Sequence, residues 1–479
     1  MNQSPYHLGF STLNSETSIK QLPVRGTVPA WLTGTLVRNG PARFEVGGQK
    51  YNHWFDGLAM LHKFAFAAGR VSYANRYLRS QAYEEAMAKG RISRGEFATD
   101  PCRSIFQRVA SWFSLKVTDN SSVNIAQWGD AVLALTESRL AVRFDPDTLA
   151  TLGVYEYDPQ LKGPLATAHP HFDAARRRYY NYMLDFGRQS KYRFFSIDQE
   201  TGRQSEVATI PVETPAYVHS FGMTERYLIL AEFPLVVNPL RLRFSGKPFI
   251  RNYEWEPDRG ARFHIVEKES GRLVRTARST AFFAFHHVNA FEKDGDEVVV
   301  DIVAYPDPAL IDQLYLDRLR SSEPVTATGK LTRFRINAGD AADNVSGERL
   351  VEASIELPRF DYGRRAGRRY RYVYGAGNEV PGNFIDNIVK LDIERGTASS
   401  WREEGCYPGE PVFVAGPQGS HEDDGVILSV VLDTRKAASF LLILDASTFS
   451  ELARADAPHH IPYGFHGNFL VQSSRSEAY

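Results

Sequence analysis

The sequence is poor in cysteine: its 479 residues include only two, Cys102 and Cys406. Two thiols exclude a disulfide-based scaffold and a cysteine-based zinc site, and they indicate a reducing compartment. We therefore expect a cytoplasmic protein.

The sequence also lacks a charge excess and any long apolar run. The formal net charge is −1, so no overall field favours a nucleic-acid partner. The first residues, "MNQSPYHLGF", have neither the basic nor the apolar region of a signal peptide, and we expect none. No stretch approaches the ~18 apolar residues of a membrane span. Any membrane contact is therefore expected to be peripheral.

Short strand-like runs are what the chain does contain. They are rich in β-branched and aromatic residues and are bounded by turn formers, as strands are. Examples are "AVLALTE" (131–137), "RYYNYML" (178–184), "RYLILAE" (226–232), "EVVVDIVAY" (297–305), "YRYVYGAG" (370–377), "GVILSVVLD" (425–433) and "FLLILDA" (440–446). The pattern predicts an all-β fold.

Many of these runs lead into a weak repeat in which a strand ends at a carboxylate and a tight turn follows. The repeat reads "FDPDTL" (144–149), "IDQETGR" (197–203), "VEKESGR" (266–272), "LDIERGT" (391–397) and "LDASTFSEL" (444–452). Recurring hairpins of this kind are typical of a β-propeller, with an all-β fold of another shape as the alternative. No linker or low-complexity tract divides the chain, so we expect one domain over residues 1–479.

Two segments break the strand pattern. Residues 99–117 predict an amphipathic helix whose apolar face carries Ile105, Phe106, Val109, Trp112 and Phe113. Such a helix packs either on its own core or at a membrane surface. Residues 233–249 also mix bulky apolar side chains with basic ones. Together the two segments can frame a greasy entrance.

Four histidines lie in similarly apolar, strand-like contexts far apart in the chain. They are His169 ("TAHPHFD"), His219 ("YVHSFGMT"), His286 ("FHHVNAFE") and His466 ("PYGFHGNF"). Taken singly, each is more often a satisfied core residue than a ligand. A propeller, however, brings distant strands to one axis, and four neutral imidazoles suit iron(II), with zinc as the rival.

A metal-bound imidazole usually donates its second N–H to a carboxylate. Three glutamates in apolar strand contexts are candidates for this role, although each can equally be a surface residue. They are Glu137 ("LALTE"), Glu356 ("IELPRF") and Glu410 ("YPGEPVFV").

At these residues the chain resembles the carotenoid cleavage oxygenase family, and within it the branch of animal β-carotene oxygenases and the retinal pigment epithelium isomerohydrolase. The resemblance runs through ordered motifs from end to end. These include "GTLVRNGPARFEVG" (34–47), "HWFDGLAMLHKFAF" (53–66), "DPCRSIF" (100–106), "VTDNSSVNI" (117–125), "EDDGVILSVV" (422–431) and the four histidine motifs.

The resemblance implies a seven-bladed β-propeller with a helical and loop cap over the metal-bearing end. It implies one iron(II) per chain, held by His169, His219, His286 and His466, and dioxygen as co-substrate. It assigns Glu137, Glu356 and Glu410 to three of the ligands and none to His169. His287, beside His286, would point away from the metal.

The implied reaction is oxidative cleavage of a C=C bond in a carotenoid or apocarotenoid, giving two carbonyl products. Central 15,15′ cleavage to retinal is favoured over eccentric cleavage. Isomerohydrolase-like ester cleavage and stilbenoid cleavage are the alternatives within the family. Outside it, the alternative is a propeller that binds a ligand or hydrolyses one with zinc or calcium.

Finer assignments also rest on the resemblance. Val123 and Phe55 are expected to line the substrate tunnel or the oxygen site, Val123 standing where many relatives have Thr. Ser122 stands where stilbenoid-cleaving members carry Lys, which lowers that alternative. "DPCR" matches a membrane-dipping segment, which favours a membrane-facing helix at 99–117.

Overall fold

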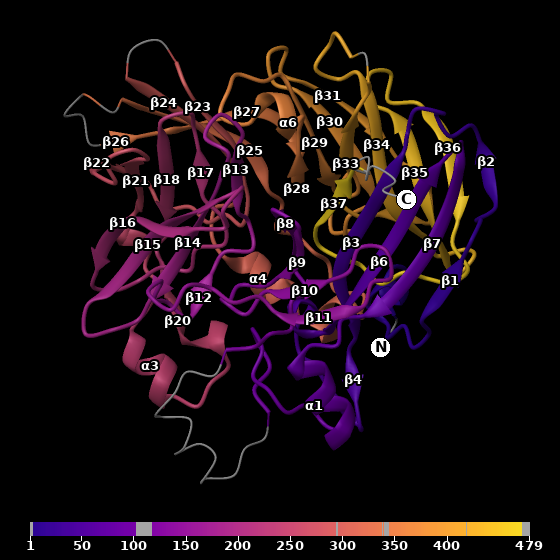
Figure 1. Cartoon of the computed structure of the whole chain (residues 1–479), viewed down its shortest axis with the longest axis horizontal. Coiled ribbons are helices and arrows are strands. Elements are labelled where there is room, and N and C mark those ends of the chain that lie inside the picture. The colour runs from indigo at the N-terminus through magenta and orange to yellow at the C-terminus, as the bar shows by residue number, and fades with distance from the viewer. Residues whose placement is uncertain are drawn as a thin grey trace.

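A computed structural model of the chain describes residues 3–101, 117–293, 296–337, 339, 344–417 and 419–471. Seven sheets surround a common axis and form a seven-bladed β-propeller, as predicted (Figure 1). The expected helix at 99–117, with all five of its apolar residues, falls almost entirely outside the described residues.

Each blade runs from an innermost strand near the axis to an outer one. Blade 1 contains β37 (Gly467–Leu470), β3 (Gly34–Arg43), β6 (Leu58–Ala67), β7 (Arg70–Tyr77) and β1 (Thr17–Ile19). Blade 2 contains β8 (Asn124–Trp128), β9 (Ala131–Leu135), β10 (Val142–Phe144) and β11 (Thr151–Val154). Blade 3 contains β12 (Leu165–Ala166) and β13 (His171–Asp173), then β14 (Arg178–Asp185), β15 (Ser190–Asp198) and β16 (Gln204–Val212).

The remaining blades follow the same plan. Blade 4 contains β17 (Gly222–Met223), β18 (Tyr227–Glu232), β21 (Ala261–Glu267), β22 (Leu273–Ser279) and β26 (Asn344–Val345). Blade 5 contains β23 (His287–Glu292), β24 (Glu297–Ala304), β25 (Lys330–Asn337) and β27 (Gly347–Ser354). Blade 6 contains β28 (Glu356–Arg359), β29 (Tyr372–Gly377), β30 (Asn387–Asp392) and β31 (Thr397–Trp401). Blade 7 contains β32 (Cys406–Pro408) and β33 (Val412–Ala415), then β34 (Gly425–Asp433), β35 (Ala438–Asp445), β36 (Glu451–Asp456) and β2 (Val24–Gly26).

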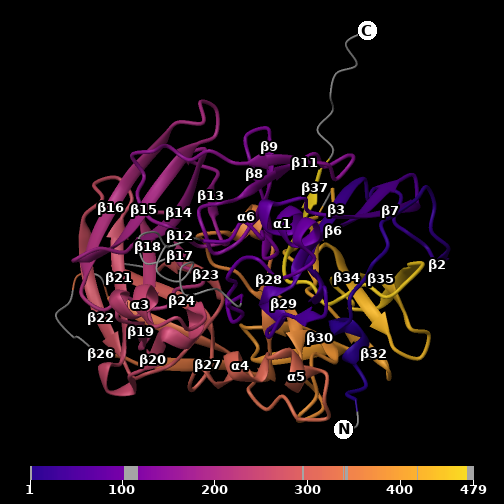
Figure 2. The same ribbon diagram turned by 90° about the horizontal axis from the view of Figure 1, so that it is seen from below.

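Two strand pairings close the ring. The C-terminal strand β37 pairs with β3, with Val37 opposite Asn468 (Figure 2). The N-terminal strand β2 pairs with β36, with Arg25 opposite Arg454. Because first and last blades each borrow a strand from the other end of the chain, these blades cannot separate without breaking ladder hydrogen bonds.

The carboxylate repeat marks one equivalent hairpin in five blades. It joins the third and fourth strands of blades 2, 3, 4, 6 and 7. In three of these turns an Asp side chain accepts from backbone N–H groups two and three residues later, as at Asp145, Asp198 and Asp445. Such Asx turns satisfy the backbone where the strand ends, which explains why the repeat was visible in the sequence.

The core lies between neighbouring blades. Strands such as β24 are buried on both faces, with Val298, Val300 and Ile302 as fully covered as Val299 and Val303. This two-sided burial explains the continuous apolar runs, where a half-exposed strand would alternate.

Short helices and irregular segments lie outside the blades. They are α1 (Gln81–Lys89), α3 (Pro239–Phe244), α4 (Ala309–Gln313), α5 (Leu316–Leu319), α6 (Tyr362–Arg365), η1 (His7–Phe10), η2 (Trp54–Asp56), η3 (Phe249–Asn252) and η4 (Pro257–Arg259). The hairpin of β4 (Glu45–Val46) with β5 (Gln49–Lys50) and the two-stranded sheet of β19 (Leu235–Val237) with β20 (Tyr253–Trp255) complete the fold. In the described part of the chain, no helix is both long and apolar enough to cross a membrane.

Candidate metal centre and substrate cavity

The four predicted histidines occupy equivalent places in four blades. His219, His286 and His466 each stand shortly before the innermost strand of their blade, β17, β23 and β37. His169 lies between β12 and β13 of blade 3. The innermost strands converge on the axis, so residues nearly 300 positions apart meet there.

The four imidazoles form one compact cluster. Their nearest ring nitrogens all lie within 4.8 Å of one another. His169 Nε2 lies 3.0 Å from His219 Nε2, and His286 Nε2 lies 3.1 Å from His466 Nε2. Three of the four residues are buried, and His169 is half-buried.

Three of the four rings are oriented from behind by the predicted glutamates. His219 Nδ1 lies 2.6 Å from Glu137 Oε1, His286 Nδ1 2.5 Å from Glu356 Oε2, and His466 Nδ1 2.7 Å from Glu410 Oε1. Carboxylates accept, so each Nδ1 carries the proton and each Nε2 presents a lone pair. No carboxylate among the described residues bonds to His169, as the family resemblance implies.

These tautomers make a cation the natural occupant of the cluster. Three Nε2 lone pairs, and that of His169 if its proton lies on Nδ1, point toward the same small volume. Unprotonated nitrogens about 3 Å apart repel one another unless a positive ion lies between them. Nitrogen–metal bonds of about 2.1 Å fit separations of this size. The donor set therefore fits a divalent transition metal.

Two tyrosines hold two of the glutamates in turn. The Tyr217 hydroxyl donates to Glu137 Oε1 at 2.7 Å, and the Tyr305 hydroxyl donates to Glu356 Oε1 at 2.9 Å. Burial raises the pKa of Glu356, but His286, the Leu357 N–H and Tyr305 lower it below its usual value. Sequence reasoning missed both tyrosines, although Tyr217 stands two residues before His219, where strand alternation places it on the same side.

Glu410 has a different and stronger set of partners. It is fully buried, accepts from Arg38 and from the Gly467 N–H at 3.0 Å, and lies 3.2 Å from Arg359 Nε. Burial raises the pKa of its carboxyl, but Arg359, His466 and Arg38 together lower it to about 2. Glu410 thus stays anionic. Sequence reasoning also missed these two arginines, which no local pattern connects to Glu410.

His287 points away from the cluster, as the family resemblance implied. Its Nδ1 lies 2.8 Å from Ser220 Oγ, and that hydroxyl donates to the Phe285 carbonyl at 2.6 Å. His287 Nδ1 is therefore the donor to Ser220. Burial lowers the pKa of His287 to about 3, which keeps the ring neutral.

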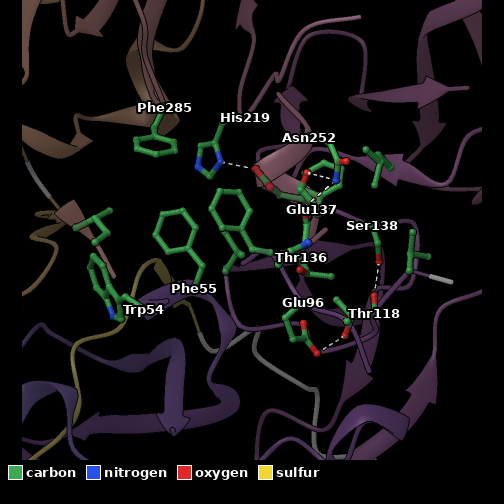
Figure 3. A pocket seen from close by; sticks show the side chains of 18 of the residues that line it. Trp54, Phe55, Glu96, Thr118, Thr136, Glu137, Ser138, His219, Asn252 and Phe285 are labelled. Carbon is green, nitrogen blue, oxygen red and sulfur yellow. Dashed lines mark hydrogen bonds and ion pairs between the residues drawn. The ribbon is translucent and has the colours of Figure 1, made fainter. Parts of the chain in front are cut away.

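A cavity of about 780 Å³ opens onto the histidine cluster. His219, His286 and His466 contribute to its wall, as do both residues predicted for the tunnel, Phe55 and Val123. Phe55 packs on Phe285, with ring centroids 5.8 Å apart, and the two rings stand beside His219 (Figure 3). The wall next to the cluster is thus largely aromatic.

Helix α3 lines the same cavity and exposes apolar side chains. Leu240 and Phe244 are 64% and 52% exposed, and both contribute to the cavity wall. The basic residues Arg241 and Lys247 stand beside them in the sequence. The segment 233–249 therefore borders the cavity, as its composition suggested.

The family model described as retinal pigment epithelial membrane protein matches residues 10–471. The chain belongs to the carotenoid cleavage oxygenase family. The carotenoid-cleaving dioxygenase, mitochondrial, of Macaca fascicularis is 35% identical over 95% of this chain and 93% of its own length. The β,β-carotene 15,15′-dioxygenase of Gallus gallus is 35% identical over 94% of this chain and 95% of its own. The chain is accordingly a carotenoid oxygenase.

Solved structures of the family share the fold. A variant of the apocarotenoid oxygenase of Synechocystis superposes with a TM-score of 0.87 at 30% identity, covering 98% of this chain and 99% of that one. A cobalt-substituted form of the Synechocystis enzyme gives a TM-score of 0.86 at 30% identity, with the same coverage.

A second group of possible metal ligands fits this family pattern less well. Glu403, Cys406 and Asp433 bring three donor atoms within 4.8 Å of one another. Arg435 bonds to both carboxylates, and Arg454 to Glu403. Burial raises the pKa of the Cys406 thiol to about 12. Arginine already neutralises these acids, and the thiol stays protonated, so the group is better explained as an ion-pair network.

Proposed function

We propose that the protein is an iron(II)-dependent dioxygenase that cleaves a C=C bond of a carotenoid or apocarotenoid and releases two carbonyl products. The observation that carries the proposal is the convergence of His169, His219, His286 and His466, whose nearest nitrogens lie within 4.8 Å of one another. In this proposal the four Nε2 atoms hold the iron. Bound iron(II) supplies the one-electron chemistry that dioxygen needs to react.

The protein's own residues hold and shield this centre. Glu137, Glu356 and Glu410 fix three imidazoles with the proton on Nδ1, which keeps Nε2 available and makes it a better ligand. The existence of a cobalt-substituted Synechocystis enzyme with this fold supports a divalent transition metal as the occupant.

In the proposed mechanism the aromatic wall positions the polyene. A polyene has few polar atoms, so its position depends on shape and on contact with rings such as Phe55, Phe285 and Phe465. Phe55 lies 5.1 Å from Phe465 between ring centroids, and all three residues line the cavity. This wall excludes water and determines which double bond lies next to the histidines.

Central 15,15′ cleavage is our preferred specificity, supported by the name of the Gallus gallus relative. To test it, the chain is loaded with iron(II) without oxygen, given β-carotene or β-apo-8′-carotenal, and then exposed to air. We expect two identical aldehydes from β-carotene. Products of unequal mass would show eccentric cleavage. Product formed before air is admitted would show that the cleavage does not use dioxygen and would contradict the proposal, as would the absence of product from either compound in air.

We also propose that the cavity mouth docks on membranes. Leu240 and Phe244 are exposed apolar side chains at the mouth, with Arg241 beside them. Apolar side chains enter the lipid interface while basic groups meet the headgroups. A substrate that partitions into bilayers would then enter the cavity without crossing water.

A further inference from the structure

The cavity has a polar side as well as an aromatic one. Glu96, Thr118, Asn120, Thr136 and Ser138 all contribute to its wall. In Figure 3, Glu96 and Thr118 stand apart from His219, Phe55 and Phe285, which carry the aromatic side. The proposed reaction at the histidines gives these polar groups no task.

Most polar groups on this side are engaged within the protein. Ser138 Oγ donates to the Thr118 carbonyl at 2.7 Å and accepts from the Leu140 N–H at 3.1 Å. Asn120 donates to the carbonyls of Asp56 and Gly57 and accepts from the Ala59 N–H. These two side chains therefore have little left to offer a ligand.

Glu96 is different. Only 7% of the residue is exposed, and its Oε1 accepts from the Thr118 hydroxyl at 2.9 Å, with the Asn120 amide beside the same carboxyl. The arginine nearest in sequence, Arg94, pairs with Glu85 and Asp119 instead. The described residues thus provide no cation for this buried acid.

Glu96 has negative neighbours as well. Asp56, which is fully buried, is held by the N–H groups of His53 and Ala98 and by the Thr99 hydroxyl. Burial raises the pKa of Glu96 well above its usual value, and Asp56 and Asp119 raise it further. A carboxyl that is buried among acids and has no cation partner favours its neutral form, which has one O–H to donate.

We infer that Glu96 binds the oxygen-bearing end of the substrate, a hydroxyl or carbonyl oxygen at the terminus of a polyene. The inference rests on the proposed function and predicts a preference for oxygenated polyenes over hydrocarbons such as β-carotene. The Thr118 hydroxyl orients the acid, and the Glu96 O–H donates to the substrate oxygen. The remainder of the polyene lies against the aromatic wall.

A pure hydrocarbon fits this cavity less well. It would cover the Glu96 acid without giving its O–H an acceptor, and an unpaired buried donor costs free energy. A site built to hydrogen-bond a substrate oxygen discriminates against an analogue that lacks it. The polar side therefore selects for oxygenated substrates, while the aromatic side accepts either.

The test compares three polyenes of equal length, ending in a hydrocarbon ring, a hydroxylated ring or an aldehyde. Binding to the iron-loaded full chain is measured without oxygen by quenching of tryptophan fluorescence. For E96L we expect about tenfold weaker binding of the two oxygenated polyenes, since 1.4 kcal/mol corresponds to tenfold. Binding of the hydrocarbon should not weaken and should tighten, because E96L removes the O–H that the hydrocarbon leaves without an acceptor.

Two further variants separate hydrogen bonding from shape. E96Q keeps an N–H donor, so it should bind all three polyenes within about threefold of wild type. T118V removes the orienting hydroxyl and should weaken only the oxygenated ligands, by about threefold. Iron content equal to wild type shows in each variant that the fold is intact.

Equal weakening of all three polyenes in E96L would overturn the inference, because Glu96 would then act through shape alone. Unchanged binding of all three would overturn it too. Neither result bears on the proposed function, which fails only if the iron-loaded wild type cleaves no polyene in air.

Discussion

Replacing Glu410 with Gln probes the best-connected of the three glutamates. Its carboxylate is fully buried between His466, the Gly467 N–H and two arginines. Glutamine keeps the shape but removes the charge. It also places an NH2 group where several donors already converge.

The expected loss of folding free energy in E410Q follows from the arginine charge that the substitution leaves without a carboxylate. The Arg38 side chain is 6% exposed and retains its positive charge, and breaking a buried ion pair costs about 3–5 kcal/mol of folding free energy. Loss of the carboxylate behind a metal-bound imidazole lowers metal affinity about 10–100-fold. E410Q should therefore lose both stability and iron.

E356Q is the matched control. Glu356 bonds to His286, the Leu357 N–H and the Tyr305 hydroxyl, none of them a permanent cation. Its replacement should cost only about 1–3 kcal/mol, with a similar loss of metal affinity. The difference between the two variants isolates the contribution of the arginines.

Urea unfolding of the metal-free variants and competition with an iron(II) chelator measure the two effects separately. The double variant E410Q/R38M should regain part of the stability that E410Q loses, because the buried Arg38 charge is gone and only the less buried Arg359 is left without its carboxylate. Equal unfolding midpoints for E410Q and E356Q would refute the argument from buried charge.

Three other predictions follow from the same structure. Replacing any one of the four histidines with Ala should lower iron content and abolish cleavage; full iron retention in two of the four variants would contradict the ligand set. The fully buried His53 accepts from the Phe55 N–H and donates to the Ile311 carbonyl, and burial lowers its pKa to about 3. In the unfolded chain His53 is protonated below about pH 6.5, whereas in the folded chain it stays neutral. The free energy of unfolding therefore falls as the pH drops, by about 2 kcal/mol at pH 5. H53Q should remove this pH dependence, and an equal dependence of the unfolding free energy on pH in H53Q and wild type would contradict the prediction. The double substitution L240D/F244D should reduce binding of the protein to liposomes without lowering its iron content, and so should W112D/F113D. If either variant binds liposomes as wild type does, the substituted segment does not contact the membrane.

The strands could be predicted well from the sequence, because burial on both faces produces continuous apolar runs that are visible locally. The run at 425–433 coincides with β34, and that at 178–184 matches β14 to within one residue. The number of blades could not be counted from local sequence patterns. Blades 1 and 5 lack the carboxylate turn, and the pairing of β37 with β3 joins distant parts of the chain that no local pattern connects.

In the site, too, neighbouring residues predicted some features and only the assembled fold reveals the others. Strand alternation predicts only that the adjacent His286 and His287 face opposite ways, and the family resemblance selected His286 as the ligand. The selection of four histidines from thirteen came from the family resemblance, since their spacing carries no signal of its own. Arg359 and Arg38 reach Glu410 from blades 6 and 1, so only the assembled propeller reveals them.

Anomalous scattering from crystals of the iron-loaded protein, recorded on both sides of the iron absorption edge, locates the metal relative to the four histidines. We expect a single iron peak on the propeller axis, bonded to the Nε2 atoms of His169, His219, His286 and His466. Iron at another position, or a peak that fewer than four of these nitrogens reach, would contradict this ligand set.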